Sequence, residues 1–161
     1  MIKKFNLFFL SFFLIGKIKY APGTFASLVT CFLFILLINV TSIIIIFFIS
    51  LIFFFYSFVA NNYSFEDFKN DDPQEIVVDE VVGQMLPLLA IPIYESLYPL
   101  PSVYYCIAAF ILFRLFDIWK PFPVNYVDEN VKGSLGIMLD DIVAGIYSIV
   151  FLALVLFFLG G

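Results

Sequence analysis

The run IIIIFFISLIFFFYSFVA, at residues 43–60, carries no charged side chain and decides the class of protein. A helix that crosses the hydrocarbon core of a bilayer needs about 20 mainly apolar residues, and this run has nearly that length. Another apolar run, at residues 25–38, precedes it, and the short polar stretch 39–42 separates the two. The two runs predict a helical hairpin across a membrane, whose short first arm needs tilt or a locally thinner bilayer.

The composition of the whole chain agrees with a membrane location. Hydrophobic residues make up 63% of the 161 residues and charged residues 13%, against about 45–50% and about 25% in soluble domains. A soluble domain of this length could not bury so much apolar surface, so lipid must cover part of it. We therefore expect an all-α fold, with residues 1–161 forming one polytopic membrane helical bundle. A disordered chain, a coiled coil and a secreted disulfide scaffold are excluded.

The ionisable composition excludes several kinds of function. Eight basic and 13 acidic residues give a net charge of −5, which argues against a nucleic-acid partner because such binding depends on neutralising phosphates. The chain has no histidine, which excludes a Ser-His-Asp triad, a Cys-His dyad and zinc sites built on histidine. The two cysteines, Cys31 and Cys106, lie in apolar runs and are expected to pack as small apolar side chains.

We expect about five spans or partial spans, separated by turn signals. The apolar segments are residues 25–38, 43–60, 76–91, 102–119 and 137–159. Thr24 is well placed as the N-cap of the first segment, and Pro92 is expected to open a turn after the third. Two prolines end the fourth segment, and a connector that contains Gly133 and Gly136 is expected to lead into the last.

The N-terminal run Phe5–Ile15 is too short to cross a bilayer. Two lysines precede it, as in a secretory signal, but no small-x-small cleavage pattern occurs before Lys17. We therefore expect residues 1–15 to be a retained anchor that lies in the membrane interface, with a cleaved signal as the alternative.

The basic residues indicate which ends of the helices face the cytoplasm. If the chain starts inside, the outer segments are residues 39–42, about 92–101 and the last two residues, and none of them contains lysine or arginine. All eight basic residues then lie on the inner side, which is the distribution that the positive-inside rule predicts. The polar stretch 61–75 becomes a solvated inner loop.

Three groups of charged residues interrupt apolar sequence. The groups are Asp79 and Glu80, then Arg114, Asp117 and Lys120, and finally Asp140 and Asp141. A charged side chain near the centre of a bilayer costs about 2.5–3.5 kcal/mol, so such residues are functional candidates. The predicted topology places all three groups, together with Thr24, at the inner boundary of one bundle.

Each group also has a purely structural explanation. Acids in the first turn of a helix and bases in the last turn interact favourably with the helix dipole, and Arg114 and Asp117 are spaced to pair with each other. Capping requires only one acid, however, and two of the predicted helices begin with two adjacent acids. Adjacent residues point about 100° apart on a helix, so one acid of each pair can face the bundle.

Clustered carboxylates without histidine or cysteine are typical ligands of a hard cation such as Mg²⁺. Arg114 and Lys120 can bind a phosphate group, and helix N-termini add N–H donors for anions. At headgroup depth these features indicate a phospholipid substrate. The chain has no Walker-type loop, which argues against ATP, so hydrolysis with a carboxylate as general base is the expected reaction. A route through an aspartyl-phosphate stays open.

Four blocks of sequence carry these residues: APGTFASL at 21–28, IVVDEVVGQ at 76–84, FRLFDIWKPFP at 113–123 and GIMLDDIVAG at 136–145. In this order and spacing they resemble the phosphatidylglycerophosphatase A family. The resemblance implies Mg²⁺-dependent dephosphorylation of phosphatidylglycerophosphate to phosphatidylglycerol at a bacterial inner membrane. Ala26 and Ser134 replace glycines that are usual in the family, which affects loop shape rather than ionisable groups.

The resemblance implies a role for each charged residue. The Mg²⁺ ligands or catalytic, water-activating groups are Asp79, Glu80, Asp140 and Asp141. Arg114 and Lys120 clamp the substrate phosphate, and Asp117 orients Arg114 or completes the metal shell. Thr24 and the turn before it close over the substrate.

Two other functions stay open on the sequence alone. Intramembrane acids also line ion pathways, so a divalent-cation channel or carrier is the alternative, although these acids lie at one boundary and Arg114 would repel cations. A phosphoalcohol transferase also uses aspartates and a metal, but its long Asp-Gly/Ala-Arg signature is absent. The sequence predicts no particular oligomeric state.

Overall fold

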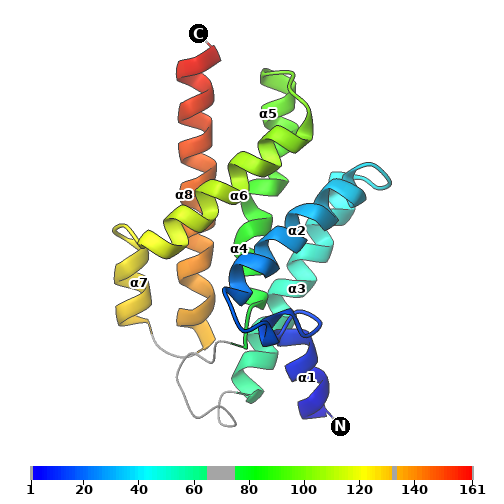
Figure 1. Cartoon of the computed structure of the whole chain (residues 1–161), viewed down its shortest axis with the longest axis vertical. Helices are drawn as coiled ribbons and strands as arrows, with labels where there is room; N and C mark the ends of the chain where they lie inside the picture. Colours follow the sequence, from blue (N-terminus) through cyan, green and yellow to red (C-terminus); the bar gives the residue numbers. More distant parts are fainter. Residues whose placement is uncertain (1, 65–74, 132–133, 161) are drawn as a thin grey trace.

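The computed structural model describes residues 2–64, 75–131 and 134–160, and these residues form helices and turns without a strand (Figure 1). In chain order the helices are α1 (Ile2–Leu10), the short 3-10 helix η1 (Ile15–Lys17), α2 (Pro22–Ile38), α3 (Ile43–Ser64), α4 (Val78–Leu89), α5 (Ile91–Leu97), α6 (Ser102–Trp119), α7 (Val124–Asn130) and α8 (Ser134–Gly160). The predicted all-α class is confirmed.

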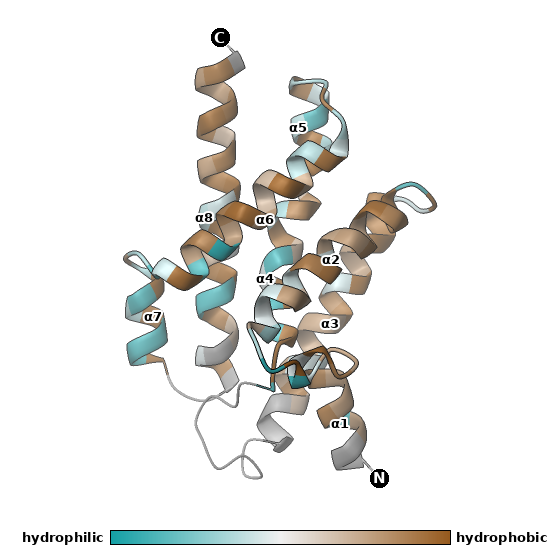
Figure 2. Ribbon diagram, in the orientation of Figure 1, coloured by the Kyte–Doolittle hydropathy of each residue, from teal (hydrophilic) through white to brown (hydrophobic). Residues whose placement is uncertain are grey.

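Three of the described helices are long and apolar enough to cross a membrane. The crossing segments are Ile43–Ala60 of α3, Ser102–Trp119 of α6 and Met138–Leu159 of α8, and α2 is a shorter apolar helix. Most of the residues in these helices are hydrophobic (Figure 2), and many of their large apolar side chains are exposed, among them Ile52 and Phe55 on α3, at 66% and 58%. So much exposed apolar surface is compatible with lipid and not with water, so the fold is a helical membrane bundle.

The helix α4 lies inside the bundle, where it packs against α2, α3, α6 and α8 (Figure 1). Its crossing with α8 is very close. A Cβ atom at Gly83 would lie 2.7 Å from the carbonyl oxygen of Asp141, and one at Gly145 would lie 2.6 Å from the carbonyl oxygen of Gly83. A side chain at either position would push the helices apart, so the two glycines allow the short distance between α4 and α8.

The segment predicted as the third span corresponds to α4, and the region predicted as a turn after it contains a second helix, α5. Helix α4 ends at Leu89, and α5 begins at Ile91 with Pro92 in its first turn. Proline is tolerated there because the first N–H groups of a helix need no partner within it. The prediction that Pro92 opens a turn was therefore wrong, because the helix α5 continues to Leu97, and residues 98–101 after it are not helical.

The start of α2 also differs from the prediction. The helix begins at Pro22, and its N-cap is Ala21 in the left-handed conformation, with φ 47°. Thr24 is therefore the third residue of the helix, and its prediction as the N-cap was wrong. Proline at the first helical position explains the earlier start, because its fixed φ already suits the helix.

The connector before the last helix contains a helix that the sequence did not suggest. This helix, α7, is short and polar, and it is held in place by the fully buried side chain of Val124. Helix α8 begins at Ser134, so Gly136 lies inside it rather than in a connector. Gly133 and most of the predicted inner loop lie outside the described residues.

The N-terminal segment packs against the start of α4. Leu10 is fully buried in a cluster with Ile76 and Val78, and the backbone N–H of Val77 donates a hydrogen bond of 3.0 Å to the carbonyl oxygen of Leu10. Phe12 packs in a neighbouring cluster with Val77. These contacts hold the residues that lead into the acidic first turn of α4. The location of residues 1–15 in a membrane interface stays a prediction.

Candidate active site

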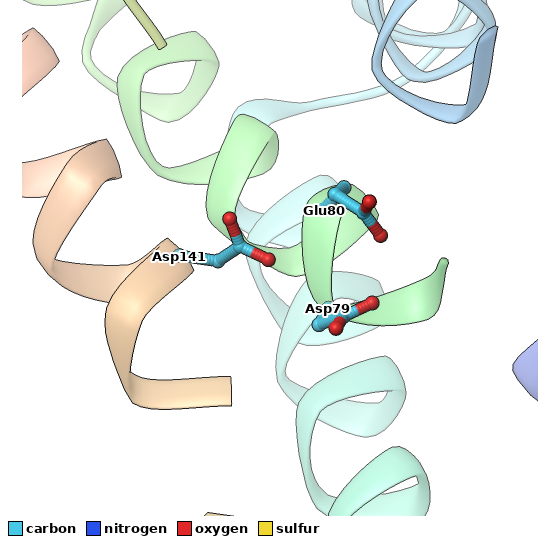
Figure 3. A group of neighbouring side chains, drawn as sticks. All are labelled: Asp79, Glu80 and Asp141. Atoms are coloured by element: carbon cyan, nitrogen blue, oxygen red, sulfur yellow. The ribbon is translucent and has the colours of Figure 1, made fainter. Parts of the chain in front are cut away.

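Four carboxylates enter the bundle from two crossing helices. Asp79 and Glu80 lie in the first turn of α4, and Asp140 and Asp141 lie in α8, beside the close crossing at Gly83. Figure 3 shows Asp141 reaching from α8 toward the turn of α4 that carries the other two labelled acids. One oxygen from each of Asp79, Glu80 and Asp141 lies within 4.8 Å of the others. Three carboxylates at this spacing can bind one metal ion.

Three of these carboxylates are buried, that of Glu80 is half-buried, and all four are incompletely bonded. Asp79 is 7% exposed and Asp141 is 4% exposed. Within the described part of the chain, no hydrogen bond reaches Oδ1 of Asp79, Asp140 or Asp141, or Oε2 of Glu80. Burying negative charges without partners is costly unless a cation neutralises them. Mg²⁺ takes oxygen ligands, commonly carboxylates together with substrate phosphate, so this set of residues fits it.

The acids line a cavity of about 450 Å³ at the end of the bundle where α2, α4 and α8 begin and α6 ends. Its lining residues are Lys19, Tyr20, Ala21, Pro22, Ile76, Asp79, Glu80, Asp117, Lys120, Asp140 and Asp141. The structure thus brings six of the eight predicted site residues to one cavity, from segments far apart in the sequence. Arg114 and Thr24 are the two that do not line it.

Arg114 lies beside the cavity and is paired with an acid that lines it. Its Nη1 atom is 2.7 Å from Oδ2 of Asp117, and each side chain is 15% exposed. This is the i, i+3 pair that the spacing predicted. Nε of Arg114 is buried and has no hydrogen-bond partner among the described residues, so the guanidinium keeps donors for another anion.

Thr24 is half-buried in the first turn of α2, next to Gly23. A Cβ atom at Gly23 would overlap the carboxylate of Glu80. The glycine therefore allows the N-terminus of α2 to contact this carboxylate, where the positive end of the helix dipole stabilises it. In this part of the chain, the residues from Lys19 to Pro22 line the cavity, and Thr24 does not.

Lys120 follows α6 in the left-handed conformation, with φ 46°. Its Nζ atom lies 2.6 Å from Oδ1 of Asp128 and 2.9 Å from Oδ2 of Asp140. Partial burial would lower the pKa of Lys120, but the hydrogen bonds and charges of the two carboxylates outweigh it and raise this pKa above its ordinary value. The side chain is therefore cationic at every physiological pH.

Three residues of this site were missed by the sequence reasoning. Asp128 lies on α7 and binds Lys120, but it stands in a polar segment where no helix was expected. Lys19 and Tyr20, from the turn before α2, line the same cavity as the acids in the first turn of α4. Their position directly before the APGT block, at residues 21–24, is the feature of the sequence that could have identified them as site residues.

The sequence matches the model of the family described as Phosphatidylglycerophosphatase A over residues 8–156. The Phosphatidylglycerophosphatase A of Haemophilus influenzae is 38% identical over 136 residues, which cover 84% of this chain and 78% of the relative. The protein of the same name from Escherichia coli is 39% identical over 95 residues, covering 59% of this chain and 49% of the relative.

A Bacteroides thetaiotaomicron protein named "Putative phosphatidylinositol-3-phosphatase" is 47% identical over 90 residues, covering 56% of this chain and 53% of the relative. The chain thus matches about half the length of two of these three relatives. No solved structure matches it.

The matched region contains α4 and most of α8, which supply the carboxylates, and Lys120, which follows α6. It extends through nearly the whole bundle, and the Haemophilus relative is similar over most of its length as well. The chain therefore belongs to the phosphatidylglycerophosphatase A family.

Proposed function

We propose that this protein is a Mg²⁺-dependent phosphatase that hydrolyses phosphatidylglycerophosphate to phosphatidylglycerol and phosphate at the cytoplasmic face of a bacterial inner membrane. One observation carries the proposal: the carboxylates of Asp79, Glu80 and Asp141 meet in a cavity that also contains the ammonium of Lys120. Acids that can hold a hard cation, next to a base that can bind phosphate, suit hydrolysis of a phosphate monoester. Membership of the family supports the same reaction.

The side chains in and beside the cavity have separate roles in the proposed reaction. Asp79, Glu80 and Asp141 would hold Mg²⁺, which activates water and polarises the phosphate when it is bound. Lys120 and Arg114 bind oxygens of the phosphate and offset the charge that develops on them. Arg114 lies beside the cavity, and its ion pair with Asp117, which lines the cavity, fixes its guanidinium.

Asp140 is placed to act as the general base. Its Oδ2 accepts a hydrogen bond from Lys120, while its Oδ1 has no partner in the described part of the chain. In the proposed step the water oxygen bonds to phosphorus, the ester P–O bond breaks, and one proton of the water passes to Oδ1 of Asp140. The departing glycerol oxygen takes a proton from solvent and leaves as a hydroxyl group.

The surroundings of the cavity support a lipid substrate. Tyr20, which lines the cavity, is 73% exposed, and Trp119, next to Lys120, is 71% exposed. Tyrosine and tryptophan side chains of membrane proteins concentrate at the level of the headgroups. A phosphate on a headgroup can then enter the cavity while the acyl chains stay in the bilayer. The absence of lysine and arginine from the predicted outer segments supports the cytoplasmic face.

The test measures phosphate release by the purified full chain in detergent micelles. The substrates are phosphatidylglycerophosphate, phosphatidylinositol-3-phosphate, which the name of the Bacteroides relative suggests, and phosphatidic acid. We expect hydrolysis of the first to be fastest, to require Mg²⁺ and to stop with EDTA. Asp79→Asn and Asp141→Asn should each abolish release without preventing membrane insertion, because each removes a negative ligand from the cluster.

A matched control comes from an acid at the opposite end of the bundle. Glu95 on α5 accepts a hydrogen bond from Ser102 and lies outside the cavity, so Glu95→Gln should keep normal activity. Near-normal hydrolysis by both aspartate variants would overturn the proposed site. Uptake of Mg²⁺ into liposomes without any phosphatase activity would instead favour a cation channel or carrier.

A further inference from the structure

We propose that Asp128 is a positioning residue, which acts together with Asp140 to orient the ammonium of Lys120 for phosphate binding. This inference rests on the proposed function, since it concerns the binding of the same phosphate. Asp128 comes from α7, the short helix that the sequence gave no reason to expect. Asp128 does not itself line the cavity, but its carboxylate forms an ion pair with Lys120, which does.

The geometry at Lys120 leaves one of its protons available. A lysine ammonium has three N–H donors. One is donated to Oδ1 of Asp128 at 2.6 Å and a second to Oδ2 of Asp140 at 2.9 Å. With two donors fixed by carboxylates from α7 and α8, the direction of the third is set as well. That third donor is the one that a bound phosphate can accept.

Asp128 also keeps Lys120 away from the other acids. The lysine side chain is long and flexible, and the cavity contains Asp117 and the carboxylate cluster as competing partners. Without a carboxylate on the α7 side, we expect the ammonium to move toward these acids and occupy the space of the cation or the phosphate. Asp128 therefore holds the charge at the rim, where a phosphate enters.

The helix that carries Asp128 is fixed to the rest of the bundle. Val124, one turn before Asp128, is fully buried in a cluster with Phe113, Phe116 and Ala144. In the loop before α7, the carbonyl oxygen of Phe122 accepts a hydrogen bond of 2.8 Å from the hydroxyl of Tyr147 on α8. These contacts give Asp128 a defined position although 44% of its side chain is exposed.

The experiment compares Asp128→Asn, Asp128→Glu and the matched control Glu129→Gln, an exposed neighbour outside the site. We expect Asp128→Asn to lower kcat/KM for phosphatidylglycerophosphate by about three- to tenfold, mainly through a higher KM, because an exposed ion pair sets the position of the lysine rather than the chemistry. Asp128→Glu should restore most of the loss, and Glu129→Gln should behave as the wild type.

A double-mutant cycle with Lys120→Gln separates positioning from general support of the fold. If Asp128 acts through the lysine, Asp128→Asn has no further effect once Lys120 has been replaced. The same loss in both backgrounds would overturn the proposal, and so would a wild-type KM in Asp128→Asn.

Binding of inorganic phosphate, measured by calorimetry in the presence of Mg²⁺, gives a readout that does not depend on turnover. It should weaken in Asp128→Asn by a similar factor, and unchanged binding would count against positioning. If the wild type binds phosphate in this way but does not hydrolyse phosphatidylglycerophosphate, the proposed function fails while the positioning role holds.

Discussion

A single methyl group at residue 83 should disturb the active site through the crossing of α4 and α8. In Gly83→Ala the new Cβ would lie 2.7 Å from the carbonyl oxygen of Asp141 and 2.7 Å from a ring carbon of Phe113, whereas ordinary contacts begin near 3.4 Å. The helices must therefore separate by about 0.7 Å, the difference between these distances. Overpacking of this kind should lower the free energy of unfolding by about 1–3 kcal/mol.

The same movement separates the carboxylates, because Asp141 moves with α8 while Asp79 and Glu80 stay with α4. A misplacement of about 1 Å in an active site can lower the rate by about 100-fold. A separation of about 0.7 Å should therefore lower kcat/KM by about 10- to 100-fold. The measurement is the initial rate of phosphate release at saturating Mg²⁺, together with thermal unfolding of the same preparation.

The control for this prediction is Ala109→Val on α6. Ala109 is fully buried in the apolar cluster that contains Tyr105 and Cys106, away from the carboxylates. The larger side chain should lower the melting temperature in a similar way but leave kcat/KM within about threefold of the wild type. A folded Gly83→Ala variant with wild-type kcat/KM would refute the reasoning, as would an equal loss of activity in the control.

Three further outcomes are expected from the same contacts. Gly23→Ala should raise the Mg²⁺ concentration needed for half-maximal activity, with little change in melting temperature, because the new Cβ displaces the flexible end of Glu80; an unchanged Mg²⁺ titration would contradict this. Tyr94→Phe removes the hydrogen bond of 2.9 Å to the carbonyl oxygen of Ile149 and should lower the free energy of unfolding by about 0.5–1.5 kcal/mol without slowing phosphate release. Adding EDTA should lower the melting temperature of the wild type, since bound cation stabilises the folded state, whereas Asp141→Asn should show no such shift.

The features that the sequence predicted well are those set by local pattern. The helix over residues 102–119 has the bounds of α6, because prolines stand before its start and after its end. The start of α3 at Ile43 follows from a polar stretch next to a long apolar run. The meeting of the three charged groups followed from topology, since successive helices that reverse direction return to the same boundary.

The features that the sequence did not predict depend on contacts between distant residues. Helix α7 has a polar sequence and is held by the burial of one side chain, Val124. Its sequence therefore has no hydrophobic periodicity from which a helix could be predicted. Asp128 could be recognised as a site residue only after α7 was placed against α8. Helix α5 escaped prediction because a proline in the first turn of a helix resembles a proline in a loop.

The two helices that form the carboxylate cluster are made at different times. Asp79 and Asp141 are 62 positions apart, from 141 minus 79, so a ribosome that adds about 5–20 residues per second reaches the second roughly 3–12 s after the first. During this interval α4 can pack against α2 and α3 but lacks α8, and its 12 residues are too few to cross a bilayer alone. We expect α4 to wait at the translocon or the bilayer surface until α8 emerges, so that the carboxylate cluster forms only after α8 has been made.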